Sequence, residues 1–339
     1  MPAERVAEDV YVIRLGRGLM ATNVYLVRTD ESWVLIDTGW RRDADAVSDA
    51  AEALLGAGAR PIAILLTHLH PDHSGAAPAL ARRWDLPVHV HPVELPQAEG
   101  KLLPRYANPL DRRILGPLLR LLPAKTRARL VAAGDLTGTA HGLDTITGPP
   151  GLPGWEAVPT PGHTPGHVAY LRRHDRVLIT GDALLTVDLN AFGRRRLAGP
   201  PWYTTWHRST AEDSIRTLAA LQPEVVAPGH GEPLTSGAAT RLQAGGGPAR
   251  HTLTTWRVRF RVLPRLPGTA DGIVTAADNR GSAFATTPTP SSEGIGVPSV
   301  RPEPSLRLPG SSRSAQTTAQ ARPRWRVLLP ARAGRRVVR

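Results

Sequence analysis

The feature that most constrains this chain is a dense cluster of potential metal ligands in the stretch 67–75. Three histidines and one aspartate fall within six residues, namely His68, His70, Asp72 and His73. The apolar run 62–66 that precedes them is typical of a buried strand. Imidazole and carboxylate groups are the usual ligands of zinc, and a catalytic site uses three or four of them and leaves one position open. The stretch therefore predicts part of a metal centre, with further ligands to be found elsewhere.

The same arrangement, a strand followed by a potential metal ligand, occurs again later in the chain. In each case an apolar strand leads into a glycine-containing turn and then into a histidine or an aspartate: His163, Asp182 and His230. If those strands share one edge of a layered structure, the seven side chains can converge. The repetition makes a metal site a much stronger prediction than one such turn would.

Strands and helices alternate over the first 244 residues. Helices are expected at 43–55, 75–84 and 211–221, the last opened by a capping box at Ser209–Glu212. This alternation predicts an α/β layered domain. Early hairpins between the first strands predict sheets of mixed rather than purely parallel type. The expected strands are 10–15, 24–27, 33–36, 62–66, 87–91, 154–158, 168–171, 176–182 and 225–227.

Residues 93–150 interrupt this alternation of strands and helices. Within them the segment 110–122 alternates leucines and isoleucine with Arg112, Arg113 and Arg120, which is the pattern of an amphipathic helix. It could be an ordinary core helix, which we take as the first expectation. It could also be a lid over the site, inserted between proline- and glycine-rich flanks, or a basic helix lying on a membrane.

The basic charge of the chain is confined to its C-terminal part. The full 339 residues carry a net charge of +13, but residues 245–339 hold 16 arginines against four acids, leaving residues 1–244 near neutral. The segment 245–339 is rich in Pro, Ser and Thr and is expected to be a disordered tail after a folded domain of 1–244. The chain has no cysteine, and its N-terminus lacks an apolar signal region. A cytoplasmic protein without a membrane partner is expected.

At this point the sequence resembles the metallo-β-lactamase superfamily of metallohydrolases over about residues 8–242. The resemblance rests on the H-x-H-x-D-H motif and on the order of the later ligands. It implies a four-layer αββα sandwich with two divalent metal ions, most often zinc, with iron or manganese in some branches. It assigns His68, His70 and His163 to the first metal, Asp72, His73 and His230 to the second, and Asp182 to the bridge between them.

The resemblance also implies an activity. A hydroxide shared by the two metals would attack the carbonyl of a small ester, lactone or thioester, as in the glyoxalase II-like and lactonase-like branches. Asp72 is the candidate to carry a proton to the leaving group, and Asp37 to orient a metal-bound histidine. Tyr203 and His207 are candidates for a substrate pocket, although they could instead pack a helix onto the sheet. The alternative is a nucleic-acid-processing or nucleic-acid-binding protein that uses the basic tail.

Overall fold

The structure is a computed structural model that describes residues 2–30, 32–101 and 103–244. The expected disordered tail at 245–339 lies outside these residues. In the described part of the chain, no helix has both the length and the apolar character needed to cross a bilayer.

The larger of two facing sheets has seven strands, which follow one another in chain order from β1 to β7. Strands β1 to β4 pair in antiparallel fashion, whereas β4 to β7 pair in parallel. The expected mixed sheet is thus observed. The strands are β1 (Glu4–Ala7), β2 (Val10–Leu15), β3 (Thr22–Arg28), β4 (Trp33–Ile36), β5 (Ala63–Leu65), β6 (Val88–Val90) and β7 (Ala140–Gly142).

The second sheet has four strands in the order β13-β10-β9-β8, and a separate two-stranded ribbon pairs β11 with β12. Strands β10 and β13 run parallel, and the other pairs run antiparallel. The strands are β8 (Trp155–Pro159), β9 (Val168–Arg172), β10 (Val177–Gly181), β11 (Leu185–Asp188), β12 (Arg194–Ala198) and β13 (Val225–Pro228).

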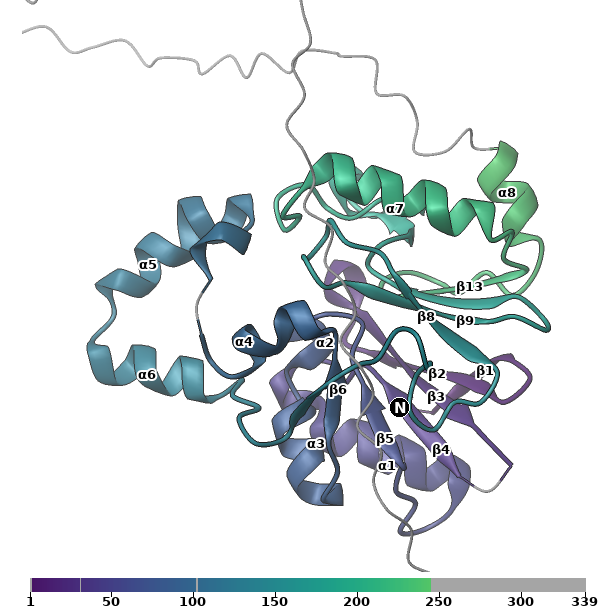
Figure 1. Cartoon of the computed structure of the whole chain (residues 1–339), viewed down its shortest axis with the longest axis horizontal. Coiled ribbons are helices and arrows are strands. Elements are labelled where there is room, and N and C mark those ends of the chain that lie inside the picture. The colour runs from purple at the N-terminus through teal and green to yellow at the C-terminus, as the bar shows by residue number, and fades with distance from the viewer. Residues whose placement is uncertain (1, 31, 102, 245–339) are drawn as a thin grey trace, which may run out of the picture. The chain divides into compact units, whose positions relative to one another are not determined.

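Helices cover the outer faces of both sheets (Figure 1). Helices α1 and α3 pack on the first sheet, and α7 and α8 pack on the second. The α-helices are α1 (Ala44–Leu55), α2 (Pro71–Ser74), α3 (Ala77–Trp84), α4 (Leu95–Ala98), α5 (Gly116–Leu121), α6 (Ala124–Ala132), α7 (Arg208–Ala220) and α8 (Ala238–Ala244). Shorter turns are η1 (Gly18–Met20), η2 (Arg41–Asp43), η3 (Pro92–Glu94), η4 (Pro104–Tyr106), the π-helical η5 (Asp111–Leu115) and η6 (Leu189–Ala191).

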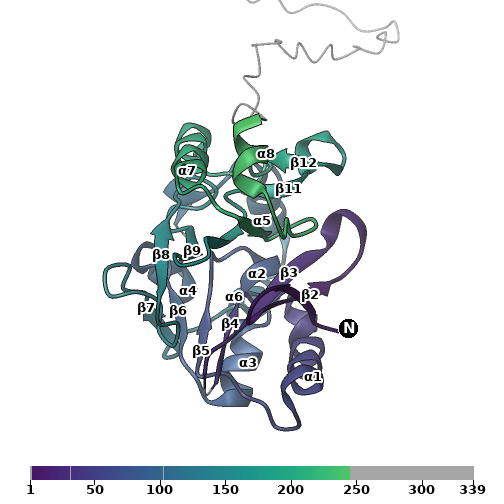
Figure 2. The ribbon, with the colours of Figure 1, turned by 90° about the vertical axis from the view of Figure 1, so that its right-hand side faces the viewer.

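Three separate apolar cores hold these layers together. One lies between the first sheet and its helices, one between the two sheets, and one between the second sheet and its helices. Three cores require four layers, so the predicted αββα sandwich is confirmed, and a quarter turn of the molecule shows the layers from the side (Figure 2). The prediction of an α/β layered domain therefore holds over the described residues.

The inner strands are mostly apolar because both of their faces are buried. In β3, Val24 and Leu26 face the helices, and Tyr25 and Val27 face the other sheet. Strand β9 is divided in the same way between the second and third cores. Successive side chains of a strand point to opposite faces, so a strand between two cores has no polar face to expose.

Two helix predictions were wrong in detail. The segment 110–122 does form η5 and α5, but neither contains a buried residue, so it is not a core helix. Its apolar pattern was correct, but no element packs against it deeply enough to bury it. Helix α7 starts before the expected capping box, with His207 as N-cap accepting a hydrogen bond from the Thr210 amide. An imidazole nitrogen replaces the serine oxygen that the pattern favoured.

Candidate metal centre

All seven predicted ligands meet at one edge of the sandwich, where the two sheets face each other. The first sheet supplies the four residues of the stretch that follows β5. The second sheet supplies His163 from the β8–β9 loop, Asp182 from the end of β10, and His230 from the turn after β13. Each strand is buried and fixed, so each turn starts from a fixed point.

The first group consists of three histidines whose ring nitrogens converge. His70 Nδ1 lies 3.1 Å from His68 Nε2 and 2.8 Å from His163 Nε2. His70 is the N-cap of the short helix α2, whose first residue is Pro71, and it presents Nδ1 to both of the other rings. These three nitrogens form a compact set that could hold one metal ion.

The second group combines Asp72 and His73, both on α2, with His230 from the opposite sheet. His230 Nε2 lies 3.3 Å from Asp72 Oδ2, and His73 Nε2 lies 4.0 Å from the same oxygen. These three atoms form another set of suitable size for a cation.

Asp182 lies between the two groups. Its Oδ1 is 3.3 Å from His73 Nε2, and its Oδ2 is 3.4 Å from both His163 Nε2 and His230 Nε2. One carboxylate thus contacts a member of the first group and two members of the second. A methyl group on Gly229 would lie 2.2 Å from Asp182 Oδ1, so glycine there gives the carboxylate its room.

The donor set fits divalent metal ions. Five imidazoles and two carboxylates, with no thiolate, match the preference of zinc, iron and manganese. Two buried atoms, His73 Nε2 and Asp182 Oδ1, have no hydrogen-bond partner among the described residues. Buried polar atoms are rarely left unpaired, and a cation between them would satisfy both.

The far side of four of the five rings is held by a second partner. His73 Nδ1 donates to Asp37 Oδ2 at 2.8 Å, and His230 Nδ1 donates to the Ala21 carbonyl at 2.7 Å. His68 Nδ1 lies 3.0 Å from Thr67 Oγ1, and His163 Nδ1 lies 3.3 Å from Thr205 Oγ1. Such contacts fix the tautomer and the orientation of a metal ligand. Asp37 thus occupies the position that the sequence predicted for it, whereas Thr67 and Thr205 were not predicted.

The two groups differ in charge. Burial and neighbouring rings hold the pKa of His68 and of His163 well below the usual value, so both are neutral. Burial acts in the same direction on His230, but Asp182 and Asp72 outweigh it and raise its pKa to about 10. Asp182 and Asp37 likewise raise the pKa of His73 well above its usual value. A cation entering the second group must displace protons, which makes binding there dependent on pH.

Glu94 is a buried residue near the centre that the sequence analysis missed. Its Oε1 accepts hydrogen bonds from Thr164 Oγ1 and from the Gly166 amide, the latter at 3.1 Å. Burial raises the pKa of Glu94 to about 7, although hydrogen bonds from these groups and from the Leu69 amide oppose the shift. Glu94 therefore ties the loop of His163 to the loop of His68 and His70. Its position just after β6, another strand exit, was an available signal.

His167 also supports the site without belonging to either ligand group. Its Nε2 accepts the amide of Asp182 at 3.0 Å, and its Nδ1 lies 2.7 Å from Thr160 Oγ1. This ring fixes the backbone on which the central carboxylate stands.

The two pocket candidates lie in different surroundings. Tyr203 is half-buried, and burial together with the charges of Asp182 and Asp72 raises its pKa, which indicates a phenol facing the cluster. His207 is exposed, and its Nδ1 lies 2.7 Å from Thr210 Oγ1 at the start of α7. The structure thus brings Tyr203, but not His207, toward the predicted ligands.

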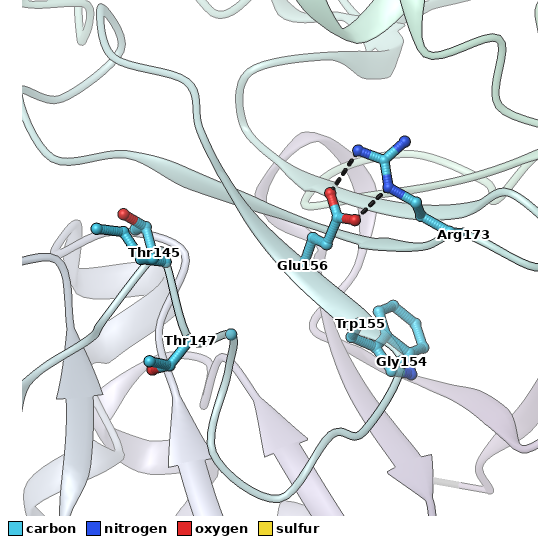
Figure 3. A pocket seen from close by; sticks show the side chains of 8 residues that line it. Thr145, Thr147, Gly154, Trp155, Glu156 and Arg173 are labelled. Carbon is cyan, nitrogen blue, oxygen red and sulfur yellow. Dashed lines mark hydrogen bonds and ion pairs between the residues drawn. The ribbon is translucent and has the colours of Figure 1, made fainter.

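A hollow of about 390 Å³ lies beside β8 and shares no residue with the ligand cluster. Glu156 and Arg173 form a two-point ion pair at its edge, and Thr145 and Thr147 line the opposite side (Figure 3). Its lining contains no histidine and no aspartate, so it adds nothing to the metal centre.

The chain is similar in sequence to several known proteins. The chain is 36% identical over 228 residues to the Bacillus subtilis protein named probable metallo-hydrolase YflN. The matched region covers 65% of this chain and 84% of the relative. It is 30% identical over 212 residues to a hydroxyacylglutathione hydrolase of Acidiphilium cryptum, covering 62% and 67% respectively. A solved structure of TTHA1623 in a di-iron-bound form is 30% identical, with 66% of this chain and 94% of the other covered and a TM-score of 0.42.

The family model of the metallo-beta-lactamase superfamily matches residues 17–230, a span that includes all seven convergent side chains. With that match, and with the four-layer sandwich that carries the cluster, the chain belongs to the metallo-β-lactamase superfamily.

Proposed function

We propose that this protein is a dinuclear metal-dependent hydrolase that cleaves a small ester, lactone or thioester. The observation that carries the proposal is the position of Asp182, whose two oxygens lie 3.3–3.4 Å from histidines of both ligand groups. A carboxylate shared in this way would hold two cations close together. Similarity to a hydroxyacylglutathione hydrolase supports an acyl bond as the target.

Two sets of residues would bind the two metal ions. His68, His70 and His163 would hold the first ion, and Asp72, His73 and His230 would hold the second. Zinc is the expected metal, with iron or manganese as substitutes. Two such ions, when bound, supply a water activated at neutral pH and polarisation of the substrate carbonyl. Hydrolysis would add one water across the bond between the carbonyl carbon and the leaving oxygen or sulfur, giving a carboxylic acid and an alcohol or thiol.

Asp72 is our candidate for moving the proton. Burial would raise its pKa, but His73 and His230 lower it to about 2, so the group is a carboxylate at neutral pH. Its side chain is 20% exposed, against 5% for Asp182. It can therefore take up the proton released from water and return it to the leaving group. Tyr203, whose pKa is raised by burial and by Asp182 and Asp72, would donate a hydrogen bond to the substrate.

The test uses the full chain, stripped with a chelator and reloaded with Zn²⁺, Fe²⁺ or Mn²⁺. We expect about two metal ions per chain and turnover of at least one member of a panel of aryl esters, lactones and thioesters. Asp72→Asn should keep its metal and lose most turnover, on the order of 10²-fold or more, the usual contribution of a proton-transfer group. A fully loaded protein that hydrolyses none of these substrates would contradict the proposal, and an active Asp72→Asn would remove the role of Asp72 alone.

A further inference from the structure

The segment 111–132, which we call the helical hairpin, exposes apolar side chains that no other described residue covers. It comprises η5, α5 and α6, and none of its residues is buried. Leu118 is 54% exposed and Leu121 is 82% exposed, and Ile114 and Leu130 are exposed to a similar degree. Apolar groups clustered on helices normally face a core, so a cluster in this position marks a contact surface.

The hairpin is also strongly basic. It carries five arginines and one lysine against a single acid, Asp111, for a net charge of +5. All six cations are exposed, and none forms an ion pair with another described residue. Charge and apolar surface therefore occur together on one short unit.

The hairpin is held at its base and stands away from the sandwich. The Leu110 amide donates to the Tyr203 carbonyl at 2.8 Å, and the Leu136 amide donates to the Ala98 carbonyl at 2.8 Å. A hollow of about 450 Å³ between α6 and the segment around Glu99 separates it from the body. In Figure 1 α5 and α6 project sideways from the layers.

Net charge distinguishes among the partners that could pack on the hairpin. A second copy would bring two faces of charge +5 together. The chain's own segment 245–339 has 16 arginines and four acids, so it too would be repelled. A partner must instead combine apolar surface with negative charge. The interface of an anionic bilayer offers both, and leucines flanked by arginine and lysine are the pattern of helices that lie in that interface.

We propose that the helical hairpin is a docking surface for an anionic lipid bilayer. Leu118 and Leu121 enter the boundary between head groups and acyl chains, and the surrounding arginines contact lipid phosphates. The base of the hairpin meets Tyr203, so docking brings the metal centre close to the membrane surface. This is a peripheral contact and requires no spanning helix.

The test is co-sedimentation of the full chain with large unilamellar vesicles of equal parts phosphatidylglycerol and phosphatidylcholine, compared with pure phosphatidylcholine. The variant Leu118→Asp/Leu121→Asp removes the apolar contact. Its matched control, Ile146→Asp/Phe192→Asp, adds the same two charges at residues that are 93% and 96% exposed outside the hairpin. Every variant keeps the basic segment 245–339, so its contribution cancels.

We expect the wild type and the control to bind anionic vesicles within about twofold of each other, and the hairpin variant to bind at least tenfold more weakly. Thermal unfolding should be the same in all three, because the altered leucines are not buried. Equal binding by the hairpin variant and the control would overturn the proposal, as would equal binding to uncharged vesicles or none to either. A wild-type dimer that the leucine substitutions convert to a monomer would also overturn it, in favour of self-association.

Discussion

At the scale of single residues, the metal centre depends on which nitrogen each histidine presents. His73 and His230 donate through Nδ1 to Asp37 and to the Ala21 carbonyl, which leaves Nε2 of both directed at Asp72 and Asp182. His70 is the exception and presents Nδ1. For His73 and His230 the choice comes from the hydrogen bonds behind the rings, so a change there should alter metal binding without touching a ligand.

Asp37→Asn tests this dependence directly. Asp37 has a positive φ of 62°, a conformation that asparagine tolerates, so the fold should persist. The amide removes the negative charge behind His73, and we expect the second metal to bind about 10–100-fold more weakly. Metal content during titration with a chelator measures this.

Asp43→Asn is the matched control, because Asp43 is also buried but accepts from the Trp40 amide, outside the cluster. Unchanged affinity for both metals in Asp37→Asn would show that Asp37 only supports the turn.

At the scale of elements, the loops that carry ligands are joined to one another as well as to their strands. Glu94 at the end of η3 holds the loop between β8 and β9 through Thr164 and Gly166. A side chain on Gly166 would collide with Glu94 Cγ at 2.7 Å, so this contact is close. The arrangement requires a carboxyl group in a buried position, and its protonation should appear in the stability of the protein.

The direction of the pH effect follows from the pKa of Glu94, which is about 7 in the folded protein against an ordinary value of 4.5. Between these values the folded state binds more protons than the unfolded state, so the free energy of unfolding falls as pH rises from 4.5 to 7. The loss amounts to about 3 kcal/mol. Glu94→Gln should lack it, and urea denaturation of both proteins at fixed metal concentration across this range measures the difference.

Glu99→Gln is the control, since Glu99 pairs with Lys101 on the surface. If wild type and Glu94→Gln kept a constant difference in stability across this pH range, the buried carboxyl would not titrate there.

At the scale of the whole molecule, the site exists only because two sheets meet. Asn23 on β3 donates through Nδ2 to the carbonyls of Pro228 and Gly231 at 2.9 and 2.8 Å, and its amide donates to the Gly229 carbonyl at 2.8 Å. The first sheet thus holds the turn of the second sheet that carries His230.

Asn23→Ala should therefore affect one metal more than the other. It leaves two buried carbonyls without their side-chain donor, which should cost about 1–3 kcal/mol in the free energy of unfolding. We expect the metal content after dialysis to fall from about two toward one per chain, because the His230 turn is released. Metal analysis and urea denaturation provide the two measurements.

Tyr170→Phe separates the two effects. Tyr170 Oη donates to the Leu66 carbonyl at 2.9 Å, which also links the sheets, but away from the His230 turn. We expect a similar loss of stability with both metals retained. Equal loss of metal in the two variants would mean that stability alone governs the metal content.

Local sequence was sufficient for most of the strands and for the identity of the seven convergent side chains. Strands such as Val10–Leu15 and Trp33–Ile36 have the predicted bounds, because an apolar run between turn residues is a local signal. The ligands could be found for the same reason, since each follows such a strand. The short strands β7, β11 and β12 were not predicted, because they carry too few apolar residues to produce a pattern.

The sequence by itself thus determined the α/β layered domain, the order of the seven convergent side chains and the elements that carry them. Only the tertiary structure decided what lies opposite each element. It placed Glu94 and Asn23 against loops distant in sequence, turned His207 into a helix cap, and left the amphipathic segment 110–122 exposed instead of in the core. Periodicity shows that a helix has an apolar face, but whether that face is buried depends on what packs against it, and nothing local encodes that.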